Sequence, residues 1–197
     1  MEERIRKRKI VLVGTGFVGM SFAYSLLSEK GINELVLIDM NKDKAVGEQM
    51  DLSDGLPYAD SKMTIKAGEY EECGDADIVV ITAGAAQKPG QTRLELVGIN
   101  ARITKDVATQ VKNSGFKGIL VVASNPVDIM TYVAYKASGL PKEHVIGSGT
   151  ILDTARLRYN ISKRLGMAPS NVHAYILGEH GDSSFVPWIH CYLGCKN

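Results

Sequence analysis

One histidine occupies a position that suits acid–base chemistry. His180 lies in the run Gly-Glu-His-Gly-Asp (178–182), which directly follows the apolar stretch Val172–Leu177. Histidine has an ordinary pKa close to neutrality, so it can both donate and accept a proton, and flanking glycines let a substrate approach closely. The same run also suits a structural histidine in a turn. The other motifs of the chain must decide between the two interpretations.

A glycine-rich run near the amino end is typical of a phosphate-binding loop. Gly14-Thr-Gly16-Phe-Val-Gly19 follows an apolar stretch and opens a helix that is expected to begin near Val18. In this context the first glycine permits a tight turn, the second lets the backbone approach a pyrophosphate, and the third allows close packing of helix on strand. The helix N-terminus adds free amide donors and the positive end of a dipole.

Asp39 stands twenty residues after Gly19, at the end of the next apolar stretch. A carboxylate there can accept hydrogen bonds from both adenosine ribose hydroxyls and would repel a 2′-phosphate, so the spacing favours NAD over NADP. The alternative is that Asp39 caps a helix that begins near Asn41.

Five further side chains are of types that bind a small oxo-acid anion. They are Gln87, Arg93, Asn125, Asp153 and Arg156. Each also has an ordinary interpretation. Asp153 and Arg156 are three apart in an expected helix and would form a surface ion pair, whereas Arg93 suits a solvated loop. Asn125 precedes a proline and suits a turn or a helix cap.

In order and spacing, these residues resemble the L-lactate/malate dehydrogenase family, in its bacterial lactate branch, over all 197 residues. The resemblance is carried by Gly14-x-Gly-x-x-Gly19, Thr82-Ala-Gly-Ala, Gln87-Lys-Pro-Gly-Gln-Thr-Arg93, Ser124-Asn-Pro-Val-Asp, Gly147-Ser-Gly-Thr-x-Leu-Asp-Thr-Ala-Arg156 and Gly178-Glu-His-Gly-Asp182. It implies an NAD-dependent oxidoreductase of glycolysis and fermentation. Such an enzyme interconverts pyruvate and L-lactate in the cytoplasm, as a homo-oligomer that is a tetramer at full length.

The resemblance also implies a role for each candidate side chain. His180 would donate and accept the proton, and Asp153 would hold its ring and stabilise the imidazolium. Arg156 would bind the substrate carboxylate as a planar two-pronged donor, which lysine would not reproduce. Arg93 would polarise the reacting carbonyl when its loop closes, and Asn125 would bind both substrate and cofactor.

Gln87 occupies the position that separates lactate from malate enzymes in the family. An arginine there would pair with a second carboxylate, whereas glutamine suits the methyl end of pyruvate. Pyruvate is therefore expected, with malate-like specificity as the alternative. The NAD contacts that the resemblance implies are Gly14, Gly16, Val18, Gly19, Asp39, Lys44, Tyr70, Gly84, Ala85, Ala123, Asn125 and Ser148.

Arg158 points to a regulatory site. It lies two residues after Arg156, which turns it about 200° around the helix and away from the substrate. The resemblance implies that Arg158 and His173 bind the effector fructose 1,6-bisphosphate across a subunit interface. The alternative to an effector site is that Arg158 is an ordinary exposed arginine and His173 an ordinary histidine in a strand.

The elements that must position these residues alternate between apolar runs and amphipathic stretches. Strands are expected at Lys9–Val13, Glu34–Ile38, Met63–Lys66, Asp77–Thr82, Ile119–Ala123, Val145–Ile146 and Val172–Leu177, and helices at Val18–Lys30, Lys42–Asp51, Leu94–Asn113, Val127–Ala137 and Ile151–Leu165. This rhythm predicts an α/β fold, a doubly wound parallel Rossmann sheet with helices on both faces.

The expected domains are an NAD-binding domain over residues 1–150 and the first part of an α+β substrate domain over 151–197. The second segment is too short for an independent core, so we expect a family member that is truncated by roughly a hundred residues. Phe185, Val186, Trp188 and Leu193 would then form an exposed apolar patch. Two functions remain open, an active dehydrogenase and an NAD-binding module with little turnover.

Composition excludes several other classes. The net charge of +1 argues against binding to nucleic acid or a membrane surface, and no stretch is long enough to span a bilayer. The three cysteines, Cys73, Cys191 and Cys195, lack a disulfide-framework spacing and predict free thiols in a reducing compartment. His190 with the last two cysteines makes an irregular cluster, so no metal site is expected.

Overall fold

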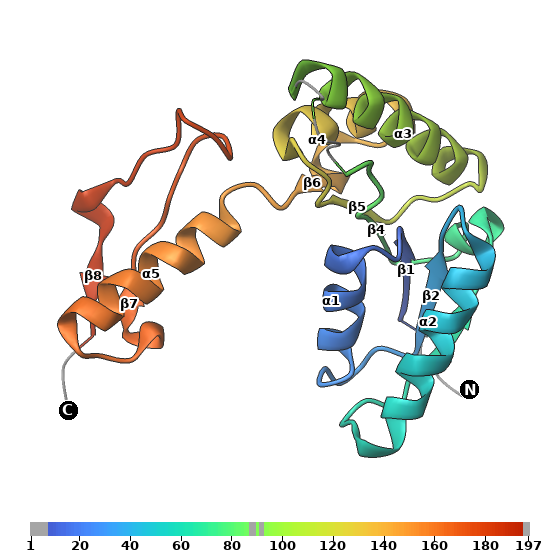
Figure 1. Cartoon of the computed structure of the whole chain (residues 1–197), viewed down its shortest axis with the longest axis horizontal. Helices are drawn as coiled ribbons and strands as arrows, with labels where there is room; N and C mark the ends of the chain where they lie inside the picture. Colours follow the sequence, from blue (N-terminus) through green and yellow to red (C-terminus); the bar gives the residue numbers. More distant parts are fainter. Residues whose placement is uncertain (1–7, 87–89, 91–92, 195–197) are drawn as a thin grey trace, which may run out of the picture. The chain divides into compact units, whose positions relative to one another are not determined.

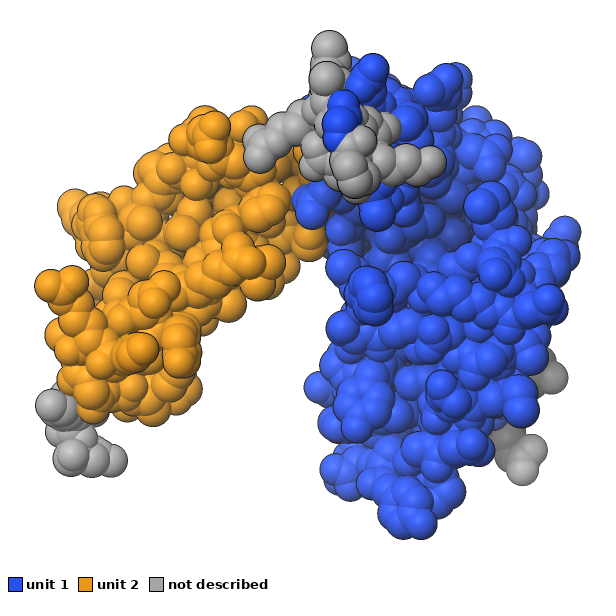
Figure 2. Space-filling model, viewed as in Figure 1, with its two compact units in different colours: residues 1–125, 129–147 blue, residues 126–128, 148–197 orange. Residues whose placement is uncertain are grey.

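The computed structural model describes residues 8–86, 90 and 93–194. Their contacts divide the chain into two compact units (Figure 2). Unit 1 comprises residues 1–125 and 129–147, and unit 2 comprises residues 126–128 and 148–197.

Unit 1 is built on a six-stranded parallel sheet in the order β3-β2-β1-β4-β5-β6 (Figure 1). Its strands are β1 (Lys9–Val13), β2 (Glu34–Ile38), β3 (Thr64–Ala67), β4 (Ile78–Ile81), β5 (Ile119–Val122) and β6 (Val145–Gly147). All six were predicted, each end lying within one residue. The chain builds outward from β1 to β3, then returns to add β4 to β6 on the other side of β1. This reversal is where a doubly wound sheet binds its ligand.

Two pairs of helices cover the two faces of this sheet. The helices of unit 1 are α1 (Phe17–Leu26), α2 (Lys42–Gly55), α3 (Arg93–Asn113) and most of α4 (Val127–Ser138). Successive strand side chains point to opposite faces. Leu12 of β1 therefore packs in the core with residues of α1 and α2, and Val13 in the core with residues of α3 and α4. The predicted α/β Rossmann class is confirmed.

Two helix ends differ from prediction. Helix α1 ends at Leu26, four residues before the predicted Lys30, because the chain tightens into three-residue turns and then passes through Gly31 at a φ of +89°. Helix α2 continues four residues past the predicted Asp51, where Leu52 packs into the core of that face. Short 3-10 helices occur at η1 (Leu56–Tyr58), η2 (Tyr70–Cys73), η3 (Lys142–His144), η4 (Pro169–Asn171) and η5 (Trp188–His190).

Unit 2 contains α5 (Ile151–Leu165) and an antiparallel pair, β7 (Val172–His173) and β8 (Tyr192–Leu193). The helix has the predicted bounds. The predicted strand over 172–177 is wrong beyond His173, and only Leu177 makes a further bridge, to Phe185.

Side chains of α5 and of its N-cap residue, Thr150, take the place of a neighbouring strand along this segment. Thr150 Oγ1 donates to the carbonyl of Ile176 at 2.6 Å, and the Ile176 N–H donates to Thr154 Oγ1 at 3.0 Å. Arg158 Nε donates to the Ala174 carbonyl at 2.9 Å. Because these backbone groups are satisfied by the helix, the segment is extended without belonging to a sheet.

Among the described residues, no helix combines the length and the apolar character that crossing a bilayer would require. Cys73 is a buried free thiol and Cys191 a half-buried one, while Cys195 lies outside the described residues. Burial raises the pKa of Cys73 to about 12, so this thiol stays protonated at neutral pH.

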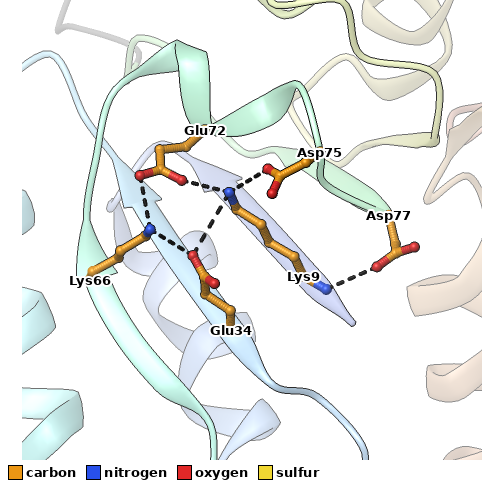
Figure 3. A network of polar contacts seen from close by, with 6 residues as sticks. All are labelled: Lys9, Glu34, Lys66, Glu72, Asp75 and Asp77. Atoms are coloured by element: carbon orange, nitrogen blue, oxygen red, sulfur yellow. Dashed lines mark hydrogen bonds and ion pairs between the residues drawn. The ribbon is translucent and has the colours of Figure 1, made fainter. Parts of the chain in front are cut away.

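A buried lysine organises a charge network at the amino end of the sheet (Figure 3). Lys9 is 5% exposed, and its ammonium lies 2.5 Å from Glu72 and 2.6 Å from Asp75. Lys66 joins the network at 2.7 Å from Glu34 and 2.9 Å from Glu72. Burial alone would lower the pKa of Lys9, but its hydrogen bonds to Asp75 and Glu72 raise it above 10.5. Hydrogen bonds from Lys9 and Lys66 lower the pKa of Glu72 below 4.5.

Removing the Glu72 charge should lower the free energy of unfolding at neutral pH. Glu72→Gln is expected to cost about 1–2 kcal/mol, because Lys9 stays buried with fewer partners. Since the pKa of Glu72 is lowered on folding, its contribution is full above 4.5 and disappears as pH falls through the lowered value. Urea unfolding of both proteins between pH 3 and pH 8 measures the difference.

Glu71→Gln is the matched control, because Glu71 is exposed in the same 3-10 helix. A difference between wild type and Glu72→Gln that stayed constant down to the most acidic pH would contradict the electrostatic account.

Candidate functional site

The three glycines of the phosphate-loop motif have different surroundings. Gly14 has a φ of +104°, and a Cβ there would lie 2.6 Å from the backbone nitrogen of Ala83. A Cβ on Gly19 would lie 2.1 Å from the Gly14 carbonyl oxygen. Among the described residues, a Cβ on Gly16 would meet no atom within 4 Å apart from those of its two chain neighbours. Gly14 and Gly19 are thus required by the fold, while Gly16 leaves an open approach to the backbone.

This open approach lies at the N-terminus of α1. Gly16 is the N-cap residue, and no side chain of the described residues caps the helix there. The amides of the first turn therefore present a positive dipole end and free donors to an anion. The loop fits the pyrophosphate of a dinucleotide.

Asp39 lies at the end of β2 and holds the loop after β1. Its Oδ2 accepts from the backbone nitrogen of Thr15 at 2.7 Å and from the Thr15 hydroxyl at 2.8 Å, while Oδ1 accepts from the Asn41 nitrogen at 2.9 Å. Burial alone would raise the pKa of Asp39, but these hydrogen bonds lower it below 3.8. Asp39 is therefore ionised at neutral pH, with about one of its four acceptor positions free for a ligand.

Another residue, and not Asp39, caps α2. The N-cap of α2 is Asn41, whose side chain accepts from the Lys44 nitrogen at 3.1 Å. The side chain of Asn41 therefore fills the capping role.

Nearly all of the predicted NAD contacts lie beyond the carboxyl ends of strands β1 to β5 in unit 1. These residues are Gly14, Gly16, Val18, Gly19, Asp39, Lys44, Tyr70, Gly84, Ala85, Ala123 and Asn125. Because parallel strands end at one edge of a sheet, this placement brings them to a common edge. Ser148 is in unit 2, between β6 and α5.

Side chains bind the loops of this edge together. Thr82 Oγ1 donates to the Gly14 carbonyl at 2.7 Å, which joins the ends of β4 and β1. Ser124 Oγ donates to the Ala83 carbonyl at 2.7 Å, which joins the ends of β5 and β4. Burial, with the nearby charge of Asp106, raises the pKa of Tyr70 to about 12, so its hydroxyl remains a neutral donor.

In unit 2 the structure brings His180 and Asp153 together. His180 Nδ1 lies 2.5 Å from Asp153 Oδ2, and the two side chains are 29% and 20% exposed. The His180 backbone nitrogen also donates to Asp128 Oδ2 at 2.8 Å. The histidine is thus anchored at ring and backbone, and none of its contacts with the described residues uses Nε2. A carboxylate on Nδ1 holds the ring in one orientation and favours the tautomer with the proton on Nδ1.

Arg156 lies beside this pair. Its Nη1 is 3.8 Å from Asp153 Oδ1, and its side chain is 64% exposed. The ion pair foreseen from the three-residue spacing therefore exists, at a long distance that leaves the guanidinium donors available. Gln87 lies outside the described residues, as does the side chain of Arg93, the first residue of α3.

Arg158 and His173 both lie in unit 2, and Arg158 contacts the residue that follows His173. Arg158 donates to the carbonyl of Ala174, and its guanidinium carbon is 4.6 Å from the Tyr175 ring centroid. It lines a depression of about 580 Å³ together with Thr150, Thr154 and Tyr175. Its Nε is committed to the backbone, whereas its terminal nitrogens donate no hydrogen bond to any residue that the structure describes.

Thr15, Asp128 and Thr154 are among the residues of these sites to which the sequence analysis assigned no role. Thr15 is a variable position of the glycine motif, and Asp128 is the last residue of the motif Ser124-Asn-Pro-Val-Asp. Thr154 lay unremarked between Asp153 and Arg156. Their roles depend on partners far away in the sequence. Thr15 alone of the three lies inside the glycine motif, next to Gly14.

The apolar patch expected in unit 2 is present in part. Phe185, Trp188 and Leu193 are exposed, while Val186 is half-buried. Within the described ranges, no group of three histidine, cysteine or acidic side chains could hold a metal ion.

The two glycines of contrasting surroundings give a paired prediction. Gly19→Ala should destabilise the protein by about 2 kcal/mol or more, because its Cβ would meet backbone. Gly16→Ala should change stability by less than about 0.5 kcal/mol but weaken NADH binding, because its methyl group would occupy the pyrophosphate approach. Thermal unfolding and NADH fluorescence titration separate the two effects. Normal NADH affinity in Gly16→Ala would argue against a dinucleotide at this loop.

Comparison with known proteins agrees with these features. Residues 8–147 match the NAD-binding domain of the lactate/malate dehydrogenase family, and residues 150–195 match its α/β C-terminal domain. The L-lactate dehydrogenase of Lactococcus lactis subsp. cremoris is 54% identical over 193 residues, which cover 98% of this chain and 62% of that protein. The L-lactate dehydrogenase of a Geobacillus strain is 56% identical over 186 residues, which cover 94% of this chain and 58% of that protein.

A solved structure gives the same result. The ligand-bound crystal structure of minor L-lactate dehydrogenase from Enterococcus mundtii matches with a TM-score of 0.93 and 54% identity, over 97% of this chain and 61% of that chain. The chain thus spans about three-fifths of the length of these relatives. From the family match over most of the chain and the shared fold, we conclude that this chain belongs to the lactate/malate dehydrogenase family.

Proposed function

We propose that this chain is an NAD-dependent L-lactate dehydrogenase that transfers a hydride between NADH and pyruvate. The observation that carries the proposal is the His180–Asp153 pair, at 2.5 Å, with the His180 backbone fixed by Asp128. An imidazole held at Nδ1 by a carboxylate presents Nε2 for proton transfer, as a hydroxyacid dehydrogenase requires. The relatives named above are L-lactate dehydrogenases, which supports the same reaction.

The cofactor and the side chains would divide the chemistry. When bound, NADH supplies the hydride that reaches the carbonyl carbon of the 2-oxo acid. His180 gives its proton to the carbonyl oxygen as negative charge develops there, and Asp153 stabilises the imidazolium before that transfer. Arg156 holds the substrate carboxylate with two parallel donors, and Arg93 adds a positive charge near the carbonyl oxygen.

The proposed cofactor-binding residues fit NAD. Gly16 leaves its backbone open, the first turn of α1 offers amide donors, and Asp39 is ionised. A carboxylate at this position would repel a 2′-phosphate, so NAD is preferred over NADP.

Gln87 supports pyruvate as the substrate. An uncharged amide would leave the second carboxylate of oxaloacetate without a partner, which costs several kcal/mol if the charge is desolvated. Malate-like specificity is therefore the second candidate.

The remaining proposals concern organisation. We propose an NAD-binding domain over residues 1–150 and a substrate domain that begins at residue 151. We also propose a cytoplasmic homo-oligomer, a tetramer at full length. A non-enzymatic NAD-binding module is the competing function. Both functions predict NAD binding, and only the enzyme predicts turnover.

Steady-state oxidation of NADH with pyruvate or oxaloacetate tests the proposal. The chain should oxidise NADH faster with pyruvate. His180→Asn should lower kcat by about 10²–10⁴ because the proton donor is lost, while NADH affinity stays unchanged. Exposed His190→Asn in the same unit is the control and should retain full activity.

NADH binding without turnover in the wild type would favour the binding module. Faster turnover with oxaloacetate would favour malate-like specificity.

An effector site at Arg158 and His173 is the finer proposal. The terminal nitrogens of Arg158 would bind one phosphate of fructose 1,6-bisphosphate, and the anion would offset the positive charge of the guanidinium. In the wild type, the bisphosphate should lower the pyruvate concentration needed for half-maximal rate. Arg158→Gln should remove this response, whereas Arg164→Gln in the exposed last turn of α5 should keep it. A wild type without any response between pH 5 and 8 would refute the effector site.

A further inference from the structure

We propose that Asn100 is a positioning residue for the nicotinamide half of NAD, because it clamps two loops at the carboxyl edge of unit 1. This inference rests on the proposed binding of NAD at that edge. No sequence motif singles out Asn100, which lies in the middle of α3.

The clamp consists of two hydrogen bonds from one amide. Asn100 Oδ1 accepts from the backbone nitrogen of Ala85 at 2.8 Å, and Asn100 Nδ2 donates to the carbonyl of Asn125 at 2.9 Å. Ala85 lies in the loop after β4 and Asn125 in the loop after β5, and the two strands are neighbours in the sheet. Asn100 is 4% exposed, so water cannot easily replace either bond.

The side-chain amide of Asn100 matches this pair of partners. Ala85 offers a donor and Asn125 an acceptor, and the amide supplies an acceptor and a donor on one planar group. Aspartate would keep the acceptor and lose the donor, and leucine would lose both. A Cβ on Gly84 would lie 3.5 Å from Asn100 Oδ1, so the first loop also lies in close contact with the amide.

The strand order indicates which half of the dinucleotide the clamp serves. Asp39 follows β2 and the Gly14 loop follows β1, so the adenosine ribose and the pyrophosphate lie on that side. Strands β4 and β5 lie on the other side of β1. The clamped loops are therefore placed for the nicotinamide half, and loss of the clamp should affect NADH more than ADP.

Calorimetric titration of the whole chain with NADH and with ADP tests this difference. Asn100→Leu should weaken NADH binding at least about tenfold, because two buried backbone groups lose their partner and the loops shift. ADP affinity should change less than about twofold. Asn100→Asp should also weaken NADH binding, because its carboxylate would face the Asn125 carbonyl. Exposed Asn113→Asp at the end of α3 should change neither affinity.

Equal losses of NADH and ADP affinity would indicate general damage and overturn the positioning role. Unchanged NADH affinity in Asn100→Leu would overturn it as well. A wild type that bound neither nucleotide would refute the proposed function and with it the positioning role.

Amide hydrogen exchange tests the clamp without any ligand. Exchange of the Ala85 amide should accelerate in Asn100→Leu and stay slow in Asn100→Asp, where an acceptor remains. The Gly14 amide, which donates to the Ile38 carbonyl at 2.8 Å, is the internal control. Unchanged Ala85 exchange in Asn100→Leu would show that the clamp does not hold the loop, whether or not the chain binds NAD.

Discussion

The carboxyl edge of the parallel sheet imposes the constraint on which unit 1 depends. The strand ladder ends there, yet the loops beyond it must be held within hydrogen-bonding distance of a ligand. Side chains do this work: Asp39 receives two bonds from Thr15, and the Thr82 hydroxyl donates to the Gly14 carbonyl. Each bond ties the end of one strand to the end of its neighbour. The edge is thereby fixed, while Gly16 and the first turn of α1 stay open.

Unit 2 solves a related problem with a helix. The segment that leads to His180 has little strand pairing, so its backbone finds partners in Thr154 and Arg158 of α5 and in the N-cap residue Thr150. Asp153 lies on the same helix, directly before Thr154. The register of the segment against α5 and the meeting of His180 with Asp153 are therefore set by one helix. The guanidinium of Arg156 lies 3.8 Å from the Asp153 carboxylate, and this long distance leaves the arginine donors for another anion.

Charges at the two ends of the sheet have different tasks. At the amino end, Lys9 is buried among carboxylates that satisfy it, so the cluster joins β1 to β2, β3 and the segment before β4. At the carboxyl end, Asp39 keeps an acceptor position unfilled. A network of paired opposite charges stabilises the fold, whereas an acceptor position without a donor has bonding capacity for a ligand. Stability and binding are in this way assigned to opposite ends of the strands.

The sequence by itself determined the alternation of strands and helices in unit 1 and the phosphate loop, because hydrophobic period and glycine spacing are local signals. It also indicated the family and the acid–base role proposed for His180. Tertiary structure alone decided which side chains support these groups. Thr15 and Asp39 are 24 residues apart, and Asp128 and His180 are 52 apart. The strand expected over 172–177 failed for the same reason: whether an extended segment joins a sheet depends on the partner beside it, and here that partner is a helix.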